Sequence, residues 1–262
     1  IQKLTGVSHF NDQIRDGIKG SVFDSADTGF ATGKFGARND VMSGIVGNVD
    51  YSTTINSKWT TAYPGQSVSY VESHDNNTLA DKIKASVKDA KPTDIAQLSQ
   101  FSASIAFLSQ GVPFMQAGQE FLRSKNGDPN SYKSSDAINS IKWNTRKSNI
   151  SSVDYYKGLI ALRKSYSAFR MTTTEQVKSN LKFSDSPEGT IVYTLNSAAV
   201  KDKAATIVVI HNANLEAQNI SLPKGGTWFV LVEDEKAGTA VIRKITGTSI
   251  SVKSRTTLVL TQ

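Results

Sequence analysis

The sequence predicts an α/β unit followed by an all-β unit. In the first part, short apolar runs alternate with segments of helical periodicity, a pattern typical of a parallel sheet or barrel. In the second part, short β-type runs are separated by Gly, Asn, Asp and Pro about every ten residues, which is typical of an antiparallel sandwich. Because the pattern changes near residues 170–175, we predict two domains, residues 1–172 and 173–262.

Composition limits the class of protein. The chain has 262 residues, of which 38% are hydrophobic and 20% charged, enough material for a sizeable core. It has no cysteine, which excludes disulfides, thiolate metal sites and cysteine nucleophiles. The absence of an apolar run of about 18 residues predicts no membrane span. An extracellular or cell-surface location in a bacterium fits this composition, and the sequence leaves the location open.

The charge balance is basic, with a formal net charge of +7. Such an excess can indicate a nucleic-acid partner or an anionic surface. The lysines are scattered, however, and no stripe of alternating aromatic and basic residues accompanies them. We therefore expect no nucleic-acid partner.

The first part carries three expected strands and four expected helices. The third helix shows the periodicity best, because its apolar residues recur at helical spacing, and Asn11 or Asp12 suits the start of the first helix. The expected strands are residues 7–10, 68–71 and 112–118. The expected helices are residues 11–19, 41–49, 93–109 and 153–167.

The second part carries seven expected strands and no helical pattern between them. Turn-forming residues punctuate these strands, so antiparallel pairing through short loops is expected. The strands are predicted at residues 181–183, 190–195, 205–210, 227–232, 241–245, 249–252 and 256–260.

The most informative pair in the chain is His74-Asp75, which directly follows the expected strand 68–71. A parallel α/β barrel keeps its chemistry at the carboxyl ends of its strands. A His-Asp pair at that position can bind adjacent sugar hydroxyls, and Asp75 can stabilise positive charge on a reacting sugar ring. The alternative is a polar strand end at which Asp75 caps the helix that begins near Thr78.

Several segments resemble type I pullulanase, a debranching member of the α-amylase superfamily of glycoside hydrolases. Residues 7–20 resemble the segment after the family's catalytic acid, and residues 69–79 resemble its fourth signature region. Residues 111–125 resemble the eighth barrel strand and the loop after it. The match continues through Asn130, Ser131, Tyr132, Asp136, Asn139 and Trp143, and it covers residues 7–168.

The resemblance implies that residues 1–172 hold the last three strand-helix units of a (β/α)8 TIM barrel, followed by the β-sandwich. In the family, the nucleophile follows strand four on an Arg-x-Asp motif, and the general acid follows strand five on a Gly-Glu-Gly-Trp-like motif. Retaining hydrolysis needs both carboxyl groups. We predict that neither motif occurs in the chain, so we expect this chain to be inactive alone and a companion amino-terminal polypeptide to supply both groups.

The resemblance also implies roles for individual residues. Asp75 would be the transition-state stabiliser, and His74 would bind substrate hydroxyls. Asn76 is a candidate sugar ligand, with a turn position as the alternative. Asn130, Tyr132 and Asn139 lie on the long loop after the last barrel strand, where substrate grooves form, with ordinary loop packing as the alternative.

The substrates implied are α-glucans, namely pullulan and branched dextrins cleaved at α-1,6 linkages. The resemblance requires no cofactor and no metal ligand, and it leaves a structural calcium ion open. Two other functions stay open. One is a non-catalytic α-glucan-binding module, and the other is an α-amylase relative of different linkage preference.

Overall fold

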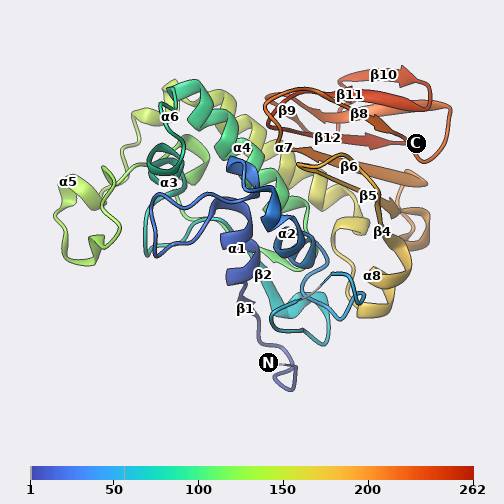
Figure 1. The fold of residues 1–262 in the computed structure, drawn as a ribbon, viewed down its shortest axis with the longest axis horizontal. Coiled ribbons are helices and arrows are strands. Elements are labelled where there is room, and N and C mark those ends of the chain that lie inside the picture. The colour runs from blue at the N-terminus through green and yellow to red at the C-terminus, as the bar shows by residue number, and fades with distance from the viewer. Residues whose placement is uncertain (1, 56) are drawn as a thin grey trace.

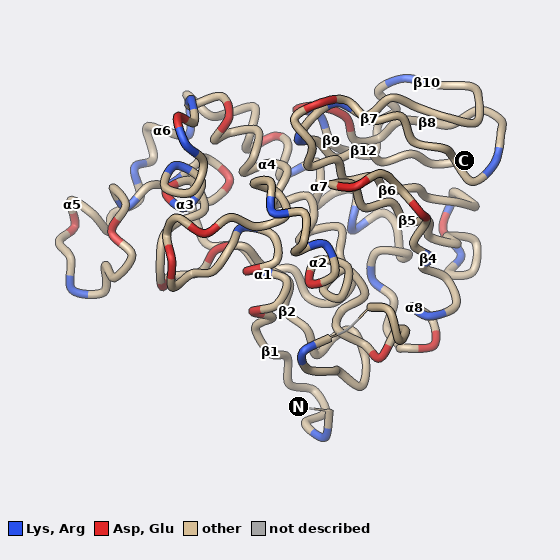
Figure 2. Tube along the Cα trace, viewed as in Figure 1, with Lys and Arg blue, Asp and Glu red and all other residues tan. Residues whose placement is uncertain are grey.

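The computed structural model describes residues 2–55 and 57–262. Helices surround a small parallel sheet on one side of the molecule, and a large antiparallel sheet stands on the other (Figure 1). Lys and Arg are dispersed over both parts rather than gathered on one surface, as the sequence predicts (Figure 2). In the described part of the chain, no helix combines the length and the apolarity needed to cross a membrane.

The three strands expected in the first part form one parallel sheet in the order β1-β2-β3. They are β1 (His9–Phe10), β2 (Ser67–Ser69) and β3 (Val112–Pro113). Their pairing aligns Phe10 with Val68 and Val68 with Val112. The sequence therefore predicts the strands and their direction correctly but overestimates their length. Within residues 2–55 and 57–262 no other strand joins this sheet, so its place in a barrel stays a prediction.

Helix α1 begins where the sequence predicts. The Asn11 carboxamide oxygen accepts a hydrogen bond from the Ile14 backbone N–H at 3.1 Å, and its amide group donates to Asn48 and Ser67. Asn11 thus caps α1 and ties the end of β1 to its neighbour β2. Helix α2 packs closely on α1, because a Cβ atom on Gly44 would lie 2.3 Å from the Ile14 Cβ.

The eight helices of the described residues agree with the four expected ones and add four more. Helix α4 is the longest and starts at Pro92, one residue before the predicted start. The added helices are α3, whose start near Thr78 the sequence suggests, and α5, α6 and α8. The bounds are α1 (Asp12–Lys19), α2 (Arg38–Ile45), α3 (Leu79–Ser86), α4 (Pro92–Leu108), α5 (Asp136–Asn139), α6 (Thr145–Ser148), α7 (Ile150–Ser165) and α8 (Thr174–Asn180).

The second part is an antiparallel structure, as predicted. A seven-stranded sheet has the order β10-β8-β12-β6-β5-β4, with β9 paired to β8, and a two-stranded sheet pairs β11 with β7. Strands β7 and β9 were not predicted. The bounds are β4 (Leu181–Ser184), β5 (Thr190–Asn196), β6 (Thr206–Asn212), β7 (Gln218–Ser221), β8 (Thr227–Glu233), β9 (Lys236–Ala237), β10 (Arg243–Thr246), β11 (Ser249–Val252) and β12 (Thr256–Thr261).

The large sheet is covered on both faces. On one face Trp228 and Leu260 pack with Ile220 and Ile250 of the two-stranded sheet in a common core. On the other face, side chains such as Val209 belong to a core that also contains residues of α4 and α7. The core that contains Val209 and residues of α4 and α7 crosses the predicted boundary at 172/173. The two parts are therefore joined by a continuous apolar interior.

Candidate active site

His74 and Asp75 lie on the exposed loop between β2 and α3. The His74 Nε2 atom is 3.5 Å from the Asp75 Oδ2 atom, and the two side chains are 85% and 71% exposed. Asp75 does not cap α3, because the Thr78 hydroxyl accepts the hydrogen bond from the Asp81 backbone N–H. The alternative that Asp75 is a helix cap is therefore wrong, and its carboxylate faces solvent next to the imidazole.

The buried Glu72 side chain holds this loop at both ends. One carboxylate oxygen accepts from the Leu79 backbone N–H at 2.7 Å, just after the loop. The other lies 2.7 Å from the Gln116 amide, which in its donating orientation also reaches the Ser73 carbonyl at 2.7 Å. Burial raises the pKa of Glu72 to about 7. The contacts make Glu72 a support for the His74-Asp75 loop.

Lys125 ties the same loop to the long loop after β3. Its Nζ atom donates to the His74 carbonyl at 3.0 Å and to the Ser131 hydroxyl at 2.7 Å. Its backbone N–H donates to Asp81 Oδ2 at 2.7 Å, which anchors it to α3. Burial lowers the pKa of this lysine. A cation buried among these acceptors fixes the two loops relative to each other.

Asn76 and Asn77 occupy different positions in the loop. Asn76 has a φ of 64°, in the left-handed region that asparagine tolerates, and its side chain is half-buried. The buried Asn77 donates to the Gly127 carbonyl at 3.0 Å and accepts from the Ser25 hydroxyl at 2.8 Å. Asn77 therefore joins three loops, a role that the sequence did not predict.

The three residues predicted on the long loop differ in their contacts. Asn130 is exposed at the start of a short 3-10 turn that contains Tyr132. The Tyr132 ring is 71% exposed, and the Lys133 Nζ atom lies 5.2 Å from its centroid. The Asn139 amide donates to the carbonyls of Ser131 and Ser134, so it shapes the loop. Tyr132 is the residue whose side chain is most open to a ligand.

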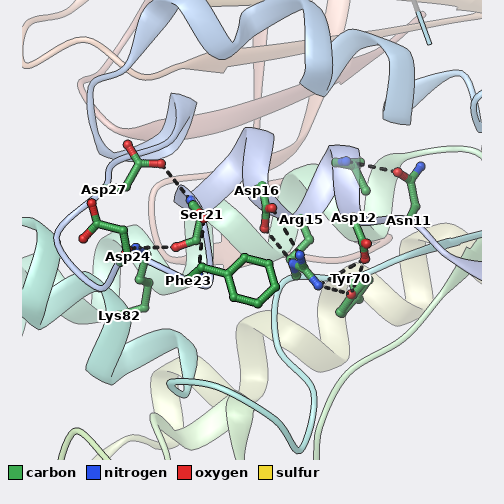
Figure 3. Close-up of polar contacts among 11 residues, drawn as sticks. Asn11, Asp12, Arg15, Asp16, Ser21, Phe23, Asp24, Asp27, Tyr70 and Lys82 are labelled. Atoms are coloured by element: carbon green, nitrogen blue, oxygen red, sulfur yellow. Dashed lines mark hydrogen bonds and ion pairs between the residues drawn. The ribbon is translucent and has the colours of Figure 1, made fainter. Parts of the chain in front are cut away.

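A further loop, residues 20–29, borders the site and was not predicted. The Lys82 Nζ atom donates to the Ser21 carbonyl at 2.9 Å and to the Asp24 carbonyl at 2.5 Å, so α3 holds this loop (Figure 3). Phe23 between them is 91% exposed. Single exposed apolar rings are common on protein surfaces, so Phe23 is a candidate because its loop contacts the site through the Ser25–Asn77 hydrogen bond. The sequence signal was a lone aromatic residue in a polar turn, which is too weak to identify it.

Arg15 forms the second cluster in Figure 3. Its guanidinium binds both Asp16 carboxylate oxygens, at 2.6 and 3.1 Å, and donates to the Tyr70 hydroxyl at 2.7 Å (Figure 3). The Tyr70 hydroxyl in turn donates to Asp12 at 3.2 Å. Arg15 thereby links the start of α1 to the end of β2 beside the site.

One tripeptide corrects the prediction that the chain has no Arg-x-Asp sequence. Arg38-Asn39-Asp40 matches that pattern, but it forms the first turn of α2 rather than following a strand. The Arg38 side chain binds the Thr190 carbonyl at 2.9 Å, and Asp40 accepts from Gln13 at 2.8 Å. These contacts are structural, so the tripeptide does not supply the nucleophile position.

Within residues 2–55 and 57–262 no group of three His, Cys, Asp or Glu side chains is arranged to hold a metal ion.

Comparison with known proteins identifies the family. The family model "Pullulanase, all-beta domain" matches residues 177–236. A pullulanase of Bacillus subtilis is 36% identical over 221 residues, which is 84% of this chain and 30% of the relative. The solved structure of pullulanase from Bacillus acidopullulyticus has a TM-score of 0.92 and 36% identity, over 98% of this chain and 30% of that one.

A second structural relative was solved with ligands. Pullulanase from Paenibacillus barengoltzii, in complex with maltohexaose and α-cyclodextrin, has a TM-score of 0.90 and 35% identity, over 99% of this chain and 39% of that one. These matches show that the chain is a relative of the pullulanases, which confirms the resemblance found in the sequence. The chain spans about 30% of the length of its Bacillus subtilis relative.

Proposed function

We propose that this chain is the carboxy-terminal part of a retaining hydrolase that cleaves α-1,6-glucosidic branches in pullulan and related α-glucans. Asp75 stabilises the positive charge that develops on the reacting sugar, and His74 binds a hydroxyl of the same sugar. The observation that carries this assignment is the solvent-facing His74-Asp75 pair, which lies at the carboxyl end of a parallel strand and is held by buried Glu72 and Lys125. A carboxylate fixed before the reaction needs no reorganisation in the transition state.

We propose that the three-stranded sheet is the sixth to eighth strands of a TIM barrel. The nucleophile and general acid then come from a companion amino-terminal polypeptide. The proposal is supported by the two unpaired edges of this sheet. Both β1 and β3 are edge strands, and the rings of Phe10 and Phe114 lie 5.1 Å apart with Phe10 50% exposed. Open edges and exposed apolar rings are features that a neighbouring strand would cover.

Around the pair we propose a groove for α-glucan formed by three loops. Asn76 and Asn130 offer amide groups to sugar hydroxyls, and Asn139, whose amide N–H groups are bound within the loop, offers its carboxamide oxygen. Tyr132 and Phe23 offer exposed rings for the apolar faces of sugars. The Lys125 contacts support a common groove, because they connect the His74-Asp75 loop with the loop that carries Asn130 and Tyr132.

Reconstitution tests the proposal. The isolated chain should release no reducing ends from pullulan, and addition of the companion polypeptide should restore release. In the restored complex, Asp75→Asn should lower the rate by about 10²–10³-fold, the loss typical of one electrostatic stabiliser. Asp154→Asn, at an exposed carboxylate on α7, should leave the rate unchanged. Release by the isolated chain would refute the division of catalytic groups between two polypeptides.

A non-catalytic glucan-binding module is the second candidate. The exposed rings of Tyr132 and Trp143 favour it, since such rings bind sugars without any carboxylate. Titration calorimetry with maltotriose on the wild type and Asp75→Asn separates the two. Equal affinity, with no companion restoring hydrolysis, favours the binding module. A different linkage preference is tested by comparing products from pullulan and amylose.

A further inference from the structure

A cavity lies at the junction between the helical part and the antiparallel sheet. It has a volume of about 320 Å³ and is bounded by the first half of α4, by α7, by the β8–β9 turn and by the start of β12. None of its lining residues belongs to the loops around His74 and Asp75. Small-molecule sites occur preferentially at such junctions, and their volumes begin at about 300 Å³.

Gln100 presents an amide group to this cavity. The residue lines the cavity and is only 4% exposed, and no other described residue hydrogen-bonds its amide. The amide atoms are not among the fully enclosed polar atoms of the described residues, so their donors and acceptor are available to a ligand in the cavity. The side-chain amide of Gln97, three residues earlier on the same face of α4, donates to the Ser254 carbonyl at 3.1 Å. The carboxamide oxygen of Gln97 is left as an acceptor. Both amides are presented by a rigid helix.

The charges around the cavity have both signs. Glu235 and Arg255 both line it, and neither makes an ion pair with another described residue. The other two carboxylates already have partners, because Asp94 accepts from the Lys91 backbone N–H and Asp234 pairs with Lys253 at 2.8 Å. A simple anion would meet the carboxylates, and a simple cation would meet Arg255.

The geometry points to a binding site for a small neutral polyhydroxy compound, of the size of a mono- or disaccharide. Hydroxyl groups both donate and accept, so they match the mixed set of amides, carboxylates and guanidinium around this cavity. Buried Phe101 and Tyr155 form the apolar floor. The site is separate from the proposed catalytic groove and does not depend on the proposed hydrolysis.

Binding to the isolated chain tests this site with glucose, maltose and glycerol as probes. Titration calorimetry and saturation-transfer NMR should show saturable binding of at least one of them. Gln100→Met, which keeps the volume and removes the amide, should weaken binding by about tenfold. Glu235→Ala, at an exposed position, should also weaken binding. Glu188→Ala, at an exposed position outside the cavity, is the matched control and should have no effect.

Asp75→Asn distinguishes this site from the proposed groove. Affinity retained in Asp75→Asn and lost in both Gln100→Met and Glu235→Ala supports a separate site. Binding lost in Asp75→Asn but retained in the two cavity variants assigns the sugar to the groove and overturns the inference. Absence of saturable sugar binding overturns the inference too. Saturable binding of inorganic phosphate or spermidine in place of the sugars would also overturn it, because that result would identify a charged ligand.

Discussion

The two sheets of this molecule differ in how they are stabilised. The parallel sheet has three strands of two or three residues, open edges on both sides and a half-exposed Phe10. The antiparallel sheet has seven strands and is covered on one face by a two-stranded sheet and on the other by helices. The antiparallel sheet is thus packed on both faces, whereas the parallel sheet carries the loops of the proposed site on a scaffold that is open at its edges.

Trp228→Ala should produce the largest loss of stability, because the Trp228 side chain is fully buried between the two antiparallel sheets. Truncating a buried tryptophan typically costs about 3–5 kcal/mol. Phe10→Ala in the parallel sheet should cost much less in the isolated chain, at most about 1 kcal/mol, because half of that ring is already in water. Urea unfolding of both variants measures the difference. Equal losses would contradict the contrast between the two sheets.

Glu72→Gln should change how stability depends on pH. Burial raises the pKa of Glu72 from 4.5 to about 7, so the native state holds this proton more tightly than the unfolded state. The free energy of unfolding should therefore fall as pH rises from about 4.5 to 7, by at most about 3 kcal/mol. Glutamine still accepts from Leu79 but does not titrate, so the variant should lose this slope. Urea unfolding at pH 5 and pH 7 checks it, and identical slopes would refute it.

Lys19 should give the opposite dependence at higher pH. Burial lowers its pKa from 10.5 to about 8, although the nearby Glu72 carboxylate opposes this shift. Between about pH 8 and 10.5 the unfolded state binds more protons, so stability should rise with pH. Lys19→Met should remove this rise, measured by urea unfolding at pH 8 and pH 10. A rise that persists in Lys19→Met would show that another group causes it.

Lys125→Met should loosen the proposed active site by a smaller amount. The change removes the bonds to the His74 carbonyl and the Ser131 hydroxyl while keeping an unbranched side chain of similar length. Hydrogen bonds to charged groups contribute about 1.5–3 kcal/mol, and relief of burying the ammonium group offsets part of this. We expect a net loss of about 1 kcal/mol and faster amide exchange in residues 73–78. Lys147→Met, at an exposed lysine on α6, is the control, and equal exchange rates in both variants would contradict the role of Lys125.

The sequence predicted the elements that depend on local pattern. The 3.6-residue spacing along α4, the cap at Asn11 and the parallel order of β1, β2 and β3 follow from side-chain periodicity and chain order. Strand β7 was missed because its residues are mostly polar and its partner β11 lies further along the chain. Strand β9 was missed because it has only two residues, which pair with the preceding strand β8. Short helices such as α5 and α8 lack the length for a clear period.

The candidate site was only partly predictable for a similar reason. His74 and Asp75 could be found because they directly follow a strand in a recognisable segment. Asn77 and Lys125 could not, because their importance lies in contacts with Ser25, Gly127 and His74 that sequence separation conceals. Whether Asn76, Asn130 and Asn139 bind sugar stays a prediction.

Arg243→Met should have the smallest effect, and it probes the edge of the antiparallel sheet. On strand β10 the guanidinium of Arg243 binds both Glu233 carboxylate oxygens on β8, at 2.8 and 2.6 Å. The pair is partly exposed, so solvent screens it and its contribution is about 0.5 kcal/mol. Urea unfolding at low and high salt should show a small loss that disappears at high salt. A loss above about 2 kcal/mol that is independent of salt would contradict the assignment of this pair as a solvent-screened surface ion pair.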